Sequence, residues 1–385
     1  MRMSVAGMDS RQLELLPEVI GADIAAGLYH GCVLQVVRGG ELVVDLALGS
    51  EKGDGARRLE ADSVFNIFSV TKAFTNLLVL QAIEQGRFSL VTPISDLIPE
   101  FKGHGREKIL MWHLLSHQAG LPILFEVTPG WAINDFAAVS KTTIAEVKPV
   151  DEPCQKVSYS PLVNHVLMAE AVLRTDPKGR RYRDLVQQEI LDRLGMKDTA
   201  VGLRPDLKPR KIVPDFRGNY PIGHKSSKTP GENGAFEDED AEMPWVGVVS
   251  TVPDMMRFTE LFRRRGTYEG ERLLSPVMID LATRNHTGEK INELYALRNR
   301  AEGIVPAPAY MGLGFAVRGE ALVHSYFGTL ASPRTFGNYG AGTSLFWVDP
   351  ERDLSFTFLS AGVMEHNANT RRFQKLADIV FAAVD

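Results

Sequence analysis

Cysteine is scarce in this chain of 385 residues, which contains only Cys32 and Cys154. Two cysteines exclude a disulfide framework and a cysteine-based metal cluster, and Cys32 falls in an apolar strand pattern typical of a small buried residue. A surplus of basic residues is also lacking, because the formal net charge is -5. We therefore expect neither nucleic acid nor an acidic membrane as a partner.

Long apolar runs are missing as well. No run approaches the length of a transmembrane helix, and charged residues interrupt the stretch before Gly27 where a signal peptide would need an apolar core. These charged residues are Asp9, Arg11, Glu14, Glu18 and Asp23. We expect a cytoplasmic protein. Its 44% hydrophobic and 24% charged content is ordinary for a globular protein with one large or two smaller domains.

The most informative stretch of the chain is residues 65–74, which includes Ser69-Val70-Thr71-Lys72. A short β-prone run ends at Ser69 and an amphipathic helix pattern follows to about residue 85, so Ser69 is expected to cap the helix. Lys72 lies one helical turn later, which places both side chains on one face. A lysine shielded by apolar neighbours can accept the proton of a serine hydroxyl and make it a nucleophile. The same spacing arises by chance about once in a chain of this length, usually as an N-cap and a surface lysine.

The order of elements predicts an α/β fold with an inserted helical part. Strands are expected at 32–37 and 42–47 around a tight turn at 38–41, and again at 313–318, 344–349 and 354–359. Helices are expected at 10–26, 69–85, 109–116, 161–174, 181–194, 252–264 and 366–383, with no convincing strand between 102 and 244. Residues 1–101 and 245–385 would then form one α/β domain and residues 102–244 a mainly helical domain, with the site in a cleft between them.

Two further stretches carry residues that a serine nucleophile needs. Tyr159 precedes Ser160-Pro161, which is expected to open a helix, so its phenol could exchange a proton with a serine oxygen. The glycines between Phe336 and Trp347 permit close backbone approach and could supply oxyanion-binding N–H groups. Taken alone, the first stretch is better explained as a tyrosine packed for its ring in a capping loop, and the second could equally be a bulged edge strand.

In this order the three stretches resemble the serine β-lactamase and penicillin-binding-protein superfamily, in particular its class C β-lactamase-related branch that includes family VIII carboxylesterases. Ser69-Val70-Thr71-Lys72 is similar to the Ser-x-x-Lys motif, Tyr159 matches the tyrosine of the Tyr-x-Asn motif, and Asn338-Tyr339-Gly340 stands at the Lys-Thr-Gly or His-x-Gly motif. Supporting matches lie at 112–121, 194–199, 247–254 and 311–315. The resemblance covers most of residues 31–363 and implies a mostly antiparallel sheet flanked by helices, with the helical domain inserted.

The resemblance also implies roles. Ser69 would attack an acyl carbonyl, Lys72 and Tyr159 would share the proton transfers, and the backbone N–H groups of Ser69 and Ala341 would bind the oxyanion. Asn338, Tyr339, Gly340, Pro161 and Trp245 would contact the substrate. No metal or organic cofactor is implied, the partner would be a small-molecule ester or acyl donor, and the oligomeric state is open.

Departures from the motifs bear on the substrate. Pro161 stands where the family's β-lactamases have an asparagine, and Asn338-Tyr339 where a lysine and a threonine bind a carboxylate. Losing one charge-assisted contact costs about 1.5–3 kcal/mol, so neutral esters are expected to react better than anionic β-lactams. Arg318 or Arg334 could supply the missing charge. The candidates for an apolar acyl pocket are Trp131, Trp245, Phe125 and Phe236, although each is more typical of core or lid packing.

The leading hypothesis is a serine carboxylesterase that forms an acyl-enzyme at Ser69. An acyltransferase that passes the acyl group to an alcohol or amine would use the same chemistry. A D-aminopeptidase or β-lactamase-type amidase is weakened by the missing lysine, threonine and asparagine. A non-catalytic ligand-binding or assembling relative is the alternative from another class, and the presence of Ser69, Lys72 and Tyr159 argues against it.

Overall fold

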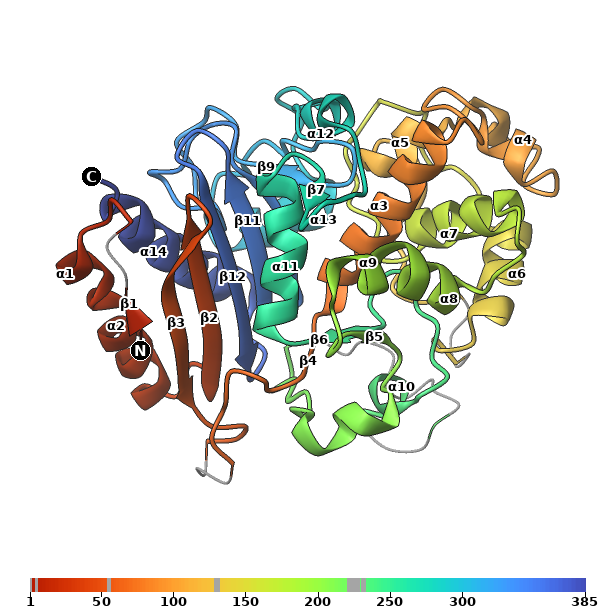
Figure 1. The fold of residues 1–385 in the computed structure, drawn as a ribbon. Helices are drawn as coiled ribbons and strands as arrows, with labels where there is room; N and C mark the ends of the chain where they lie inside the picture. The colour runs from red at the N-terminus through yellow and green to blue at the C-terminus, as the bar shows by residue number, and fades with distance from the viewer. Residues whose placement is uncertain (1, 4–5, 54–56, 128–131, 220–228, 230–232) are drawn as a thin grey trace.

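A seven-stranded antiparallel sheet joins the two ends of the chain (Figure 1). The computed structural model describes residues 2–3, 6–53, 57–127, 132–219, 229 and 233–385. The strand order is β1-β3-β2-β12-β11-β10-β9, and every neighbouring pair is antiparallel. The strands are β1 (Arg2–Met3), β2 (Gly31–Arg38), β3 (Glu41–Gly49), β9 (Ala316–Val317), β10 (Phe336–Gly340), β11 (Ser344–Asp349) and β12 (Leu354–Ala361). The predicted α/β class with a mostly antiparallel sheet is confirmed.

Both faces of this sheet are covered, which explains its nearly continuous apolar strands. Along β11, Phe346 and Val348 join the core on one face while Leu345 and Trp347 join the core on the other. Helix α11 (Val252–Arg263) covers the first face, and α1 (Ser10–Leu13), α2 (Leu15–Ala25) and α14 (His366–Ala382) cover the second (Figure 1). Side chains alternate between the two faces of a strand, so each strand contributes to two cores.

The other side of α11 faces the helical part of the molecule, which surrounds α3 (Thr71–Glu84) (Figure 1). Every residue of α3 from Thr71 to Ala82 is buried, which explains why apolar side chains occur all round it. Helices α7 (Val163–Thr175) and α8 (Tyr182–Val186) contact α3 directly, and α4 (Ile94–Leu97), α5 (Met111–Leu115) and α6 (Phe136–Glu146) contact α7. Two short helices, α9 (Asp192–Leu194) and α10 (Gly234–Glu237), follow α8 in the chain. Two further helices, α12 (Pro276–Ala282) and α13 (Glu293–Ala301), precede β9. The domain limits at 102 and 244 stay a prediction.

Several predicted elements differ in detail. The expectation of no strand between 102 and 244 is wrong, because β5 (Ala200–Val201) pairs with β6 (Val248–Ser250), which also pairs with β4 (Phe65–Asn66). Such a two-residue strand carries no readable alternation. The expected strand 313–318 is only β9, because Gly312 donates its N–H to Phe315 O in a turn. The helix expected at 181–194 is α8, a π turn (Gln187–Leu191) and α9, ended by Gly195 at φ +64°.

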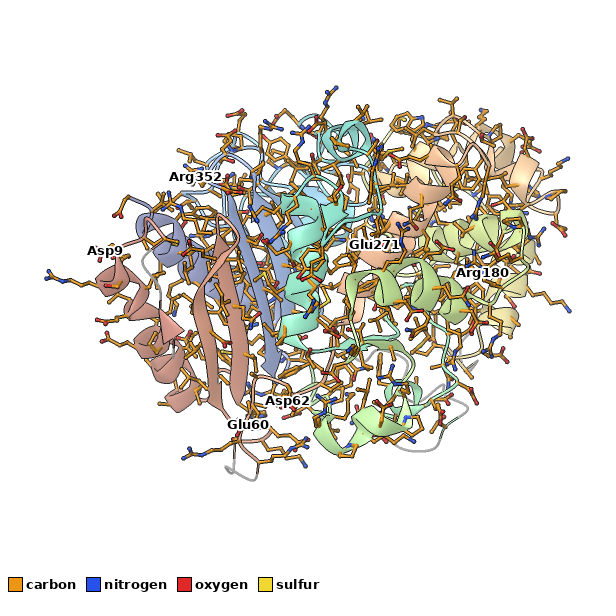
Figure 2. The ribbon with its side chains drawn as sticks, viewed as in Figure 1. Asp9, Glu60, Asp62, Arg180, Glu271 and Arg352 are labelled. Carbon is orange, nitrogen blue, oxygen red and sulfur yellow. The ribbon has the colours of Figure 1, made fainter. Side chains whose placement is uncertain are left out.

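Many charged side chains lie at the periphery (Figure 2). Asp9, Glu60, Asp62 and Glu271 are exposed and point outward (Figure 2). In the part of the chain that the structure describes, no helix is both long and apolar enough to span a bilayer. A small β-hairpin of β7 (Thr267–Tyr268) and β8 (Glu271–Arg272) completes the fold.

Candidate active site

Ser69 and Lys72 lie in direct contact at the start of α3. The Lys72 Nζ atom is 3.1 Å from Ser69 Oγ and donates a hydrogen bond of 2.9 Å to the backbone carbonyl of Trp245. Lys72 is only 2% exposed, whereas Ser69 is partly exposed and lines a cavity. The sequence spacing therefore produces the predicted juxtaposition, and Lys72 is not a solvated surface lysine.

Ser69 is held by a tight turn and does not cap the helix as predicted. It lies in the 3-10 turn Phe68–Val70, and Val70 occupies the N-cap position of α3 without a side-chain hydrogen bond. Phe68 has φ +46°, a left-handed conformation that costs a non-glycine residue about 1–3 kcal/mol. Its ring is fixed by edge contacts with Phe216 and Phe236, at centroid distances of 5.9 and 5.4 Å. Aromatic packing thus holds the strained turn that presents the serine.

Burial lowers the pKa of Lys72 well below its ordinary value. No ion pair between Lys72 and a carboxylate occurs within the described residues. An amine in these surroundings is neutral at a lower pH than an exposed lysine, and its lone pair can then accept the proton of the neighbouring hydroxyl. The arrangement can therefore activate Ser69.

Two histidines and an asparagine that the sequence analysis did not assign surround this lysine. Asn76 donates from Nδ2 to Gly314 O and accepts at Oδ1 from His165 Nε2, at 2.8 and 3.1 Å. His117 accepts at Nδ1 from the N–H of Ser160 at 3.0 Å, and burial followed by the Lys72 charge lowers its pKa to about 3. Burial, then the charges of Lys72 and His117, lower the pKa of His165. Both rings are therefore neutral, which keeps positive charge away from Lys72. Asn76 is four residues after Lys72, a spacing that does place it on the same helix face.

Tyr159 lies beside this pair. Its ring centroid is 5.4 Å from Lys72 Nζ and 4.7 Å from the His117 ring. The expected helix start is wrong by two residues: α7 begins at Val163, and Pro161 lies before it instead of at its first position. Ser160 still satisfies the helix start, because its Oγ accepts from the N–H of Asn164. The loop before α7 thus places Tyr159 and Pro161 in the wall of the Ser69 cavity.

The glycine-rich strand β10 runs against the serine. A Cβ atom on Gly340 would lie 3.0 Å from the Ser69 nitrogen and 2.5 Å from Ile67 O, so only glycine allows this approach. Ala341, with φ +22°, follows directly and lines the cavity together with Ser69 and Tyr339. The backbone N–H groups of Ser69 and Ala341 therefore belong to neighbouring segments at one cavity.

Asn338 presents an acceptor where the family motif has a cation. Its Nδ2 donates to Gly314 O at 3.2 Å, and its Oδ1 is buried without a hydrogen-bond partner among the described residues. Asn338 lines a small space of about 30 Å³ together with Ser69, Lys72, Tyr159 and Tyr339. Asn338 carries no positive charge, so a carboxylate bound here would lack the charge-assisted contact that a lysine supplies.

The main cavity at Ser69 has a volume of about 350 Å³ and a largely aromatic lining that includes Phe125, Trp245 and Tyr295. Phe236 instead packs on Phe68, and Trp131 lies outside the described residues. Arg318 does not supply a free cation, because its guanidinium donates to the carbonyls of Gly328, Gly319 and Ala321. The exposed Arg334 is not among the described residues that line this cavity. The described residues contain no group of three His, Cys, Asp or Glu side chains that could hold a metal ion.

Comparisons with known proteins identify the family and agree with the fold. The N-acetylmuramyl-L-alanine amidase of Bacillus subtilis (strain 168) is 24% identical over 384 residues, covering 92% of this chain and 82% of that protein. A penicillin-binding protein homologue from Caulobacter crescentus has the same fold at a TM-score of 0.81 and 22% identity, covering 100% and 99% of the two chains. A family VIII carboxylesterase superposes at a TM-score of 0.77 and 18% identity, covering 100% and 99%. The model of the Beta-lactamase family matches residues 18–380, and the chain therefore belongs to this family of the serine β-lactamase and penicillin-binding-protein superfamily.

Proposed function

We propose that this protein is a serine hydrolase that cleaves neutral carboxylic esters through an acyl-enzyme at Ser69. The observation that carries the proposal is the 3.1 Å contact between Ser69 Oγ and the buried Nζ of Lys72 at the edge of a cavity. A serine in contact with a desolvated amine is a nucleophile with its base already in place.

The reaction proceeds in two halves. Ser69 Oγ bonds to the ester carbonyl carbon while its proton passes to Lys72 Nζ, and the N–H groups of Ser69 and Ala341 bind the oxyanion. The bond from the carbonyl carbon to the alcohol oxygen then breaks, and the proton reaches that oxygen through the Lys72–Tyr159 pair. A water molecule repeats these steps on the acyl-enzyme, which releases the acid and restores Ser69.

The choice of a neutral substrate rests on the charges around the cavity. None of the described side chains that line it belongs to an arginine, lysine, aspartate or glutamate, and most are aromatic or aliphatic. Asn338, which lines the small space beside Ser69 and Lys72, offers no positive charge to a carboxylate near the nucleophile. These features support an ester over a β-lactam or a peptide terminus, both of which carry a carboxylate.

Acyl transfer to an alcohol or amine stays the nearest alternative, because it differs only in the acceptor that attacks the acyl-enzyme. An amidase or β-lactamase-type activity has less support, because Asn338 stands where a lysine would bind the carboxylate of such a substrate. A non-catalytic relative would not need a buried lysine against the serine.

Rapid-quench mass spectrometry of the protein mixed with p-nitrophenyl acetate tests the proposal. We expect an acetyl group on the peptide that contains Ser69, formed as fast as the first turnover of p-nitrophenol. Ester turnover with no adduct on Ser69 would overturn the covalent mechanism. No turnover and no adduct in folded protein would favour the non-catalytic alternative.

A further inference from the structure

A second cavity, larger than the first, adjoins the Ser69 cavity. It has a volume of about 500 Å³ and lies between the loop after α13, the loop after β9 and the first turns of α14. We refer to it as the second chamber. Ser69, Lys72 and Tyr159 are not among the described residues that line it, so it is not part of the reaction centre itself.

Four ring side chains line both cavities: Tyr295, Tyr326, Tyr339 and His366. We call this set the aromatic wall. Tyr295 stacks on His366 and Tyr326 on Tyr339, each pair with centroids 3.9 Å apart. Tyr326 Oη and His366 Nδ1 are joined by a hydrogen bond of 2.8 Å that connects the two stacks. Because the same four side chains border both spaces, the second chamber lies directly against the Ser69 cavity, with the aromatic wall between them.

The lining of the second chamber suits an apolar group. Ile304, Pro306 and Phe327 contribute apolar surface, and Val305 and Leu322 stand at its open edge with 84% and 87% of their surface exposed. No carboxylate belongs to the described lining. Of its two arginines, the buried Arg318 is already bonded to backbone carbonyls, and Arg371 is exposed. Exposed aliphatic side chains at the rim of a cavity are typical of a site for an apolar ligand.

The position of Tyr159 indicates which part of an ester reaches the wall. Under the proposed function, the leaving alcohol oxygen receives its proton from the Lys72–Tyr159 pair and therefore lies on the Tyr159 side of the carbonyl carbon. The Tyr159 ring is 6.4 Å from the ring of Tyr295, the first member of the aromatic wall. The alcohol side of the substrate thus faces the wall, and the acyl side faces away from it.

We propose that the second chamber binds an extended apolar alcohol moiety of the substrate. This inference rests on the proposed function and adds the class of substrate: esters of long-chain or bulky apolar alcohols. By microscopic reversibility the same chamber holds an apolar alcohol that attacks the acyl-enzyme, so acyl transfer would favour such acceptors over short ones.

The test compares octyl acetate, ethyl acetate and methyl octanoate as substrates. We expect wild type to hydrolyse octyl acetate at least about tenfold better than ethyl acetate in kcat/KM. Leu322→Asp should remove most of this preference and leave ethyl acetate unchanged. Leu322 is exposed, so its replacement should not prevent folding. Val277→Asp is the matched control, since Val277 is 77% exposed and lies outside the described lining of both cavities.

Ala307→Trp provides a second variant that fills the chamber, with Ala25→Trp on the surface of α2 as its control. A loss confined to methyl octanoate would overturn the proposal by assigning the chamber to the acyl chain. An equal rate on octyl acetate in wild type, Leu322→Asp and Ala307→Trp would also overturn it.

Calorimetric binding of 1-octanol to Ser69→Ala separates this inference from the proposed function, because it needs no turnover. If Ala307→Trp abolishes the binding of 1-octanol, the proposal that the second chamber binds an alcohol is supported, even if no ester is hydrolysed. If Ala307→Trp leaves the binding of 1-octanol unchanged, the proposal for the second chamber is overturned, even if ethyl acetate is hydrolysed at Ser69.

Discussion

The surroundings of Lys72 and Lys211 show what separates a catalytic lysine from a merely buried one. Both side chains are at most 5% exposed, and burial lowers the pKa of both, that of Lys211 to about 7. Lys211 Nζ donates to Asn66 Oδ1 and to Ile212 O, an amide and a peptide carbonyl that cannot act as nucleophiles. Lys72 Nζ instead contacts the hydroxyl of Ser69 at the edge of a cavity.

A lowered lysine pKa therefore does not identify the site in this protein. Glu237 and Glu51 oppose the effect of burial at Lys211, whereas desolvation alone accounts for the lowered pKa of Lys72. Burial makes a lysine a base, but only contact with a nucleophile that a substrate can reach makes that base useful. The following experiments test this distinction, from the largest expected effect to the smallest.

Exchanging each lysine for alanine gives the largest contrast. Lys72→Ala should lower kcat on p-nitrophenyl acetate by at least about 10⁴-fold, as should Ser69→Ala, and the double variant should be no worse because the two residues act as a unit. Lys211→Ala should keep kcat near the wild-type value in the protein that remains folded. Stopped-flow kinetics measures kcat, and circular dichroism checks that each variant is folded. A comparable loss of kcat in folded Lys211→Ala would contradict the distinction between a catalytic Lys72 and a merely buried Lys211.

Tyr159→Phe should lower kcat by about 10²–10³-fold, less than Lys72→Ala, because it removes one proton-transferring hydroxyl and leaves the Ser69–Lys72 contact intact. The ring contacts with His117 and Tyr295 stay possible in phenylalanine, so KM should change little. Tyr295→Phe, outside the reaction centre, is the control for loss of a cavity hydroxyl. Near wild-type kcat in Tyr159→Phe would show that Lys72 alone handles the protons.

The uncharged side chain of Asn338 predicts discrimination against anionic substrates. Wild type should hydrolyse p-nitrophenyl acetate at least about a hundredfold better, in kcat/KM, than a chromogenic cephalosporin. Asn338→Lys should raise kcat/KM for the cephalosporin and leave kcat/KM for the ester unchanged. Arg334→Lys is the control, because it introduces a lysine at an exposed position outside the cavity without changing the net charge. Efficient cephalosporin turnover by wild type would contradict the ester assignment.

Lys211 should affect stability rather than rate, and only in a defined pH window. Its pKa is about 7 in the folded protein and about 10.4 in the unfolded chain, so the unfolded state binds more protons between these values. The free energy of unfolding of wild type relative to Lys211→Met should therefore rise with pH from 7 to 10, by up to ~1.4 kcal/mol per pH unit. Urea unfolding at pH 6, 8 and 10 checks this. A difference that is constant over the series would show that Lys211 is not titrating as described.

Local patterns predicted much of the fold. Strand alternation and the Gly39-Gly40 turn gave the β2–β3 hairpin, and apolar runs gave β11 and β12. The contact of Ser69 with Lys72 followed from one turn of helix. The surroundings of Lys72 could not be predicted in the same way, because His117 and His165 come from segments that meet α3 only through tertiary packing. The second chamber was missed for the same reason, since its lining comes from three separate segments.

The most direct test of the account is the pH dependence of Ser69 labelling by a fluorophosphonate, in which Ser69 Oγ bonds to phosphorus and fluoride leaves. We expect one adduct per chain on Ser69, with a labelling rate that falls as acid protonates Lys72 at a pH well below the ordinary lysine pKa. Lys211→Met should give the same profile as wild type, and Lys72→Ala should abolish rapid labelling. A folded protein that is not labelled at Ser69, or a rate that rises only as pH approaches the pKa of an exposed lysine, would contradict the claim that buried Lys72 activates Ser69.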